Sequence, residues 1–215
     1  MNLDPKTLPK DLKEIQPRPS QVWNFDEIGF DPNGSCLSVF CTYKFFTGKR
    51  MWKSQIGERA PFWFTSLFFT RAYGQCFMPP MIVHQAENYT QDLHWNIPSD
   101  WLVHSTPSGY MDMDGCMKSM SLFSRTCGSI KMNPQVLLFD GHDIHFDDRA
   151  THILQSHHIS PFVLKAGNST NDQPNDNGPN LKLKRYYGIA KVKWQRQHGT
   201  MKFTPAHMNS VLVEM

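Results

Sequence analysis

Two aspartates stand where an apolar run of the sequence ends. Asp26 closes the run VWNFD, and Asp140 closes the run QVLLFD. Such runs are typical of buried strands, and the continuous apolar character of the second is typical of a strand in a parallel sheet. Because sites in open α/β sheets lie beyond the carboxyl ends of the strands, we expect both carboxylates to face one site.

A third carboxylate is expected from the polar loop NSTNDQPNDNGPN, which carries Asp172 and Asp176. Clustered carboxylates repel one another, and a hard divalent cation offsets that repulsion. Two such ions about 4 Å apart hold the attacking and leaving oxygens of a phosphoryl displacement. The alternative is that each aspartate caps a turn or a helix, and the spacing alone leaves both interpretations open.

The elements that must position these residues alternate in the second half of the chain. The first strand is expected over residues 21–30, with its end near Asp26, and a turn follows at 31–34. Further strands are expected at 60–74, 76–87, 135–140 and 160–166, and helices at 111–127, 147–159 and 181–199. This order predicts an α/β fold, a mixed sheet with helices on its faces. Residues 1–20 are expected as an irregular lead-in and residues 21–215 as one domain.

The helix expected at 181–199 is basic and follows Asp176 closely. Next to a site for phosphodiesters, we favour a basic face that holds a DNA backbone, and the alternative is an ordinary solvated face. The DNA-binding candidates on this helix are Lys182, Lys184, Arg185, Lys191 and Lys193.

The composition describes a globular protein, because 40% of the 215 residues are hydrophobic. No run approaches 18 apolar residues, so no membrane span is expected. The N-terminal segment lacks the apolar stretch of a secretory signal. Five cysteines, an odd number without C-x-x-C spacing, predict reduced thiols in the cytosol or nucleus. A net charge of +3 permits a polyanionic partner but does not require one.

Histidines near Asp140 raise the alternative of a zinc site. No spacing among them matches a Cys/His zinc pattern, and no cysteine lies nearby in the sequence. We therefore expect His142 to steady the loop after Asp140 and the other histidines to lie on the surface. These are His145, His152, His157 and His158.

Several blocks of the sequence, in order, resemble the catalytic domain of DDE-superfamily endonucleases, the pogo- and mariner-like transposases. NFDEIGF resembles the family block N-x-D-E-[TS]-G-F, and LLFDGHDIH resembles L-L-[LF]-D-G-H-x-x-H, which carries the second catalytic aspartate. Further similar blocks are IGERAPFWFTSLFF, CFMPPMIVHQAE, STPSGYMDMDGCMKSM and FTPAHMNSVLVEM. The resemblance covers the chain from about Val22 to its last residue.

The resemblance implies a ribonuclease-H-like fold and a metal-dependent endonuclease that cleaves or transfers DNA strands at phosphodiesters. It implies two Mg²⁺ or Mn²⁺ ions bound by Asp26, Asp140 and Asp176, DNA as the partner and a nuclear location, and it admits a homodimer. The helix-turn-helix DNA-binding domains that such transposases carry upstream are not expected in this chain, which therefore also fits a fragment. Two alternatives stay open: a catalytically silent DNA-binding remnant, and a domesticated protein-interaction module with the same fold.

Two segments compete for the third position of the family's triad. THILQSHHI resembles T-T-H-I-L-Q-P-L-D and would put His158 there, with 17 residues between it and Asp140. DQPNDNGPNLKLKR resembles Q-P-[LN]-D-x-G followed by a basic helix, and it gives Asp176 with 35 residues in between. The longer gap leaves room for the expected helix and strand, and Mg²⁺ prefers oxygen to imidazole. We therefore expect Asp176 to complete the cluster, and Asp172 and His158 to point elsewhere.

Overall fold

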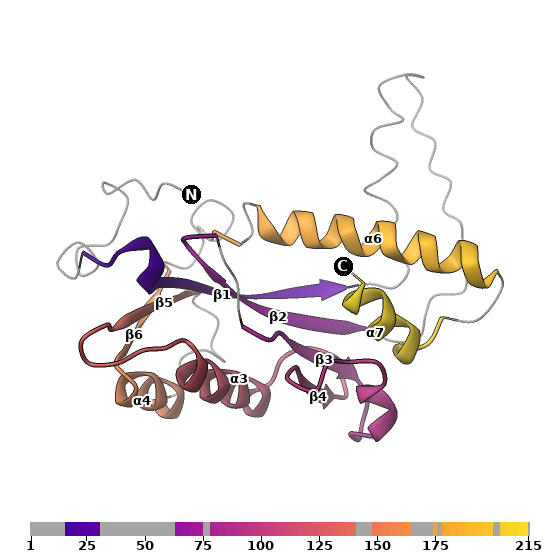
Figure 1. Cartoon of the computed structure of the whole chain (residues 1–215). Coiled ribbons are helices and arrows are strands. Elements are labelled where there is room, and N and C mark those ends of the chain that lie inside the picture. Colours follow the sequence, from indigo (N-terminus) through magenta and orange to yellow (C-terminus); the bar gives the residue numbers. More distant parts are fainter. Residues whose placement is uncertain are drawn as a thin grey trace, which may run out of the picture. The chain divides into compact units, whose positions relative to one another are not determined.

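The structure, a computed structural model, describes residues 16–30, 63–74, 78–140, 148–164, 174–175, 178–199 and 203–214. The order of its elements is η1 (Pro19–Gln21), β1 (Val22–Phe30), β2 (Phe64–Arg71), β3 (Met81–Gln85), η3 (Gln91–His94), β4 (Leu102–Thr106), α3 (Met113–Thr126), β5 (Gln135–Phe139), α4 (Asp148–Ser156), β6 (Ile159–Val163), α6 (Pro179–His198) and α7 (Pro205–Val213). In the described ranges, β1, β2 and β3 come before η3, and from β4 to α6 strands and helices alternate (Figure 1). Among the helices of the described ranges, none is both long and apolar enough to span a bilayer.

The strands form one mixed six-stranded sheet in the order β4-β3-β2-β1-β5-β6, with helices flanking it. β5 pairs in parallel with β1 on one side and with β6 on the other, and all five of its residues are buried. A strand enclosed in this way has no polar face, which is why its sequence reads as an unbroken apolar run. β3 and β4 form a further parallel pair.

By its contacts the chain divides into two units, and the first comprises Met1–Glu27, Leu67–Pro80 and Met111–Asn177. Its core is aromatic. Phe69 of β2 stacks on Phe123 of α3 with ring centroids 4.6 Å apart. Trp23 of β1 meets Phe123 edge-on at 5.4 Å. α3 and α4 pack side by side in this unit (Figure 1).

The helix α3 forms where its sequence supplies both a cap and an apolar stripe. The Asp112 side chain accepts a hydrogen bond of 2.8 Å from the backbone N–H of Gly115, which satisfies a donor of the first turn. Cys116, Met120 and Phe123 follow at spacings of three and four residues, and all three are buried. This stripe holds the helix against the aromatic core of the first unit.

The second unit comprises Ile28–Ser66, Met81–Tyr110 and Gly178–Met215. Its core gathers Phe30 of β1, Phe64 of β2 and Tyr187 of α6, all within ring-contact distance of one another. α6 ends at Gly199, whose φ of +60° continues no right-handed helix. The chain then returns as α7, which packs on α6 (Figure 1).

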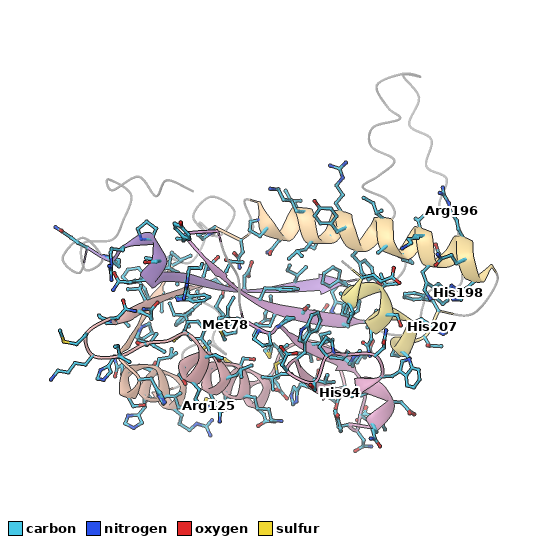
Figure 2. The ribbon with its side chains drawn as sticks, in the orientation of Figure 1. Met78, His94, Arg125, Arg196, His198 and His207 are labelled. Carbon is cyan, nitrogen blue, oxygen red and sulfur yellow. The ribbon has the colours of Figure 1, made fainter. Side chains whose placement is uncertain are left out.

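Trp194 of α6 joins the end of that helix to the start of α7. The His198 ring stacks on the indole at 4.4 Å, and the His207 ring lies 4.6 Å from it. Both histidines lie close together in Figure 2. Phe203 meets the indole edge-on at 5.0 Å. These rings bury Trp194 to 7% exposure and stabilise the return of the chain.

Most of the expected elements are present, and two differences matter. β1 continues to Phe30, so the expectation that the first strand ends near Asp26 is wrong. Ile28 and Phe30 are both 1% exposed, and burial of these alternating apolar side chains extends the strand. The strand β4 was not expected at all. The turn expected at 31–34 lies outside the described residues.

Candidate metal-binding site

Asp26 lies on the face of β1 that faces away from α3. Side chains of a strand alternate between the two faces of a sheet, so Asn24 and Asp26 share one face while Trp23 and Phe25 share the other. The contact of Trp23 with Phe123 identifies the second face as the one that α3 covers. Asp26 is 9% exposed, and its Oδ1 accepts a hydrogen bond of 2.9 Å from the backbone N–H of Glu27.

The parallel pairing of β1 and β5 leads toward the two predicted aspartates. The paired residues are Val22 with Val136, Trp23 with Leu137 and Asn24 with Leu138. β5 ends at Phe139, and this register, if it were continued by two residues, would align Asp26 with Asp140. Phe25 and Phe139, which stand one residue before the two aspartates, fit this alignment, because their rings meet edge-on at 6.5 Å.

Residues paired in a parallel ladder project to the same face of the sheet, and neighbouring strands lie about 4.8 Å apart. We therefore expect Asp26 and Asp140 to come within reach of one cation. Two carboxylates at this spacing repel one another unless a cation or a proton offsets the charge. Hard oxygen ligands of this kind fit Mg²⁺ or Mn²⁺, which supplies the chemistry for activating a water or hydroxyl oxygen.

A hydrogen-bond network below the two aspartates ties three strands to the segment before Asp176. The amide of Asn24, 4% exposed, donates to the carbonyl of Leu138 at 3.1 Å. Its Oδ1 accepts from the backbone N–H of Asn175 at 3.0 Å. The hydroxyl of Thr70 on β2 donates to the side-chain oxygen of Asn175. Asn175 is fully buried, so this segment is fixed to the face that carries Asp26.

The third predicted carboxylate, Asp176, lies outside the described residues, as does its competitor Asp172. Within the described ranges no group of three or more His, Cys, Asp or Glu side chains is placed to hold a metal ion. The metal site formed by Asp26, Asp140 and Asp176 therefore stays a prediction.

His158, the other competitor, lies at the opposite end of β5. Its carbonyl accepts hydrogen bonds from the backbone N–H of Gln135, the first residue of β5, and from the hydroxyl of Ser129. Asp140 follows the last residue of the strand, about 16 Å away at about 3.3 Å per residue. His158 is exposed, in a turn with φ of +59°, and does not reach the Asp26–Asp140 edge.

The other histidines give no support to the zinc alternative. His152 and His157 are exposed on and after α4, as expected of surface residues. The ring of His157 bonds to the carbonyl of Ile153 one turn earlier in the chain. His142 and His145 lie outside the described residues, so the expected support of the Asp140 loop by His142 stays a prediction.

Four of the five basic candidates on α6 are exposed, and one is not. Lys191 is 4% exposed, with its ammonium group 5.9 Å from the centre of the Phe203 ring. The expectation that Lys191 contacts a DNA backbone therefore does not fit the structure. It falls on the same side of the helix as Trp194, three residues later, which is also buried. The exposed candidates are Lys182, Lys184, Arg185 and Lys193.

Sequence reasoning did not assign Asn24, Thr70 or Asn175 to the site. Asn24 carried a signal, since it is an amide between apolar residues of a strand, where a buried polar side chain needs a partner. Thr70 and Asn175 carried none, because their pairing depends on which strands are neighbours.

The chain was compared with known families, curated proteins and solved structures. No family model, curated protein or solved structure matches it. The resemblance of its sequence blocks to DDE endonucleases therefore stays a prediction.

Proposed function

We propose that this chain is a ribonuclease-H-like DDE endonuclease domain that uses divalent metal ions to cleave or transfer DNA strands. Asp26, Asp140 and Asp176 hold Mg²⁺ or Mn²⁺. The ions supply the activation of a water or a DNA 3′-hydroxyl for in-line attack, and they offset charge on the phosphodiester. The carboxylates of this chain bind and orient the ions.

One observation carries the proposal. β1 and β5 pair in parallel up to Asn24 and Leu138, and Asp26 and Asp140 each follow two residues later in the chain. Carboxylates held close together repel one another, and a shared divalent cation offsets that repulsion. Two aspartates that follow paired positions on neighbouring parallel strands therefore support the binding of a cation.

The exposed basic residues of α6 support DNA as the substrate. Lys182, Lys184 and Arg185 lie within the first two turns of a helix that begins three residues after Asp176 in the chain. Each phosphate contact made by such a side chain releases a counterion and makes binding depend on salt. The double variant Lys184→Ala/Arg185→Ala is therefore expected to weaken DNA binding and to lower the salt slope by about 1 per removed charge.

Nicking of supercoiled plasmid DNA with Mg²⁺, Mn²⁺ or EDTA tests the proposal. We expect metal-dependent nicking by the unaltered chain and none by Asp26→Asn or Asp140→Asn, which change charge but not size. Asp114→Asn is the matched control, because Asp114 is 64% exposed on α3 and forms an ion pair with Lys118 at 2.6 Å.

The outcomes separate the proposal from its alternatives. Nicking that persists in Asp26→Asn contradicts it. Salt-dependent DNA binding without nicking points to a catalytically silent DNA-binding remnant. A chain that neither nicks nor binds DNA leaves the protein-interaction module.

A further inference from the structure

The amide of Asn24 is placed to control the geometry of the proposed metal site without touching the metal. It stands two residues before Asp26 on β1 and bonds to Leu138, two residues before Asp140 on β5. It also bonds to Asn175, one residue before Asp176. A single side chain therefore contacts all three segments that lead to the predicted carboxylates.

Both polar atoms of the Asn24 side chain bond to the protein, which suits a positioning role. Its Oδ1 accepts the backbone N–H of Asn175 at 3.0 Å. Its amide nitrogen donates to Leu138 and cannot bind a cation. With 4% exposure, the group has its hydrogen bonds satisfied inside the protein.

The partners of Asn24 are held in turn. Asn175 is 0% exposed, and its side-chain oxygen accepts the hydroxyl of Thr70 from β2. The bond from Asn24 holds the backbone of Asn175, and the bond from Thr70 holds its side chain. Together they fix the position and the direction of the chain at Asn175. Bonds of this kind are each worth about 1 kcal/mol, but their directional effect on nearby ligands is larger.

We propose that Asn24 is the positioning residue of the metal site, and that with Thr70 it fixes the Asn175 segment against the edge that carries Asp26 and Asp140. This inference rests on the proposed function. Loss of the Asn24 amide frees the Asn175 segment and lets β5 shift against β1, so the carboxylates no longer converge on one ion. The partners that orient metal ligands typically change metal affinity by about 10–100-fold.

Binding of Mn²⁺ to the DNA-free chain tests this inference without reference to activity. Free Mn²⁺ is measured by electron paramagnetic resonance during titration, at a temperature where circular dichroism shows each variant to be folded. We expect Asn24→Ala to weaken Mn²⁺ binding by about 10-fold or more and Thr70→Val to weaken it severalfold. The matched control is Ser66→Ala, which also removes one buried hydroxyl bond of β2, the 3.3 Å bond to the carbonyl of Met81.

The results distinguish this inference from the proposed function. If the unaltered chain binds no Mn²⁺, the proposed function fails and the inference fails with it. If it binds Mn²⁺ and folded Asn24→Ala binds equally well, Asn24 has only a structural role and the inference alone is overturned. Should Asn24→Ala not fold, Thr70→Val decides, because it keeps the size of the side chain. Equal losses in Thr70→Val and Ser66→Ala would also contradict the inference.

Discussion

His84 on β3 is buried as a neutral ring, and acid is expected to destabilise the protein through it. The side chain is 1% exposed. Burial lowers the pKa of His84 to about 4, although the carbonyl of Leu93 and the side chain of Asn209 favour the charged ring and oppose the shift. Asn209 is fixed by its own bonds to the carbonyls of Leu93 and Trp95, both 2.9 Å, so it cannot turn freely to stabilise a charge.

The size of the effect follows from the two protonation equilibria. The unfolded chain binds a proton at His84 near pH 6.5, and the folded chain does so only near a pKa of about 4. Stability from this group is therefore complete above pH 6.5 and is lost as the pH falls toward 4. The full difference is about 3 kcal/mol, of which about 2 kcal/mol has been lost by pH 5.

Urea unfolding of the unaltered chain and of His84→Gln, at about pH 7.5 and about pH 5, measures this loss. Glutamine cannot take up the proton, so the stability difference between the two proteins should shift by about 2 kcal/mol in favour of the variant on acidification. His152→Gln is the control, because His152 is exposed on α4. If His84→Gln and the unaltered chain lose stability in parallel, His84 does not bury its neutral form and the argument fails.

Two predictions concern packing. Gly29→Ala should lower the free energy of unfolding by about 2 kcal/mol in urea, since the added Cβ would lie 2.2 Å from Cζ2 of Trp63. The double variant with Trp63→Ala should lose less stability than the sum of the two single losses. Phe123→Ala should cost about 3–5 kcal/mol because Phe123 contacts both Phe69 and Trp23, and Phe123→Leu should cost clearly less; equal losses would show that the ring contacts add nothing to burial.

The sequence predicted the elements that have a clear period or a clear boundary. β5 was predicted because burial on both faces leaves an unbroken apolar run. The end of α6 was predicted because Gly199 adopts the positive φ that glycine favours. β4 was missed because Leu102–Thr106 is short and mixes apolar with polar residues, and its pairing with β3 decides its conformation.

Burial within α6 was harder to predict than the helix itself. The basic residues of its sequence indicate a polar helix, and Lys191 reads like the others. In the structure Lys191 is buried and its ammonium group lies over Phe203, which comes from beyond the end of the helix. The local sequence pattern of α6 cannot indicate this contact, because Phe203 lies outside the helix. A lysine can also bury its alkyl chain readily.

Asp26 lies inside β1, whereas Asp140 follows the end of β5, because the two strands differ in length. Their pairing stops at Asn24 and Leu138, and β5 ends at Phe139, whereas β1 continues to Phe30. After Phe139, no residue of β5 lies beside β1.

Because β5 is shorter than β1, the end of β5 lies beside the middle of β1. Asp140 stands where β5 ends, and Asp26 stands where β1 loses its partner. The sequence signal for both aspartates was the end of an apolar run. That signal marks the end of a strand for Asp140 but not for Asp26, which lies inside β1. The amide of Asn24 bonds to Leu138 and Asn175, which ties both neighbouring segments to β1 just before Asp26. A cation shared by Asp26 and Asp140 is what we propose for this end of the strand pair.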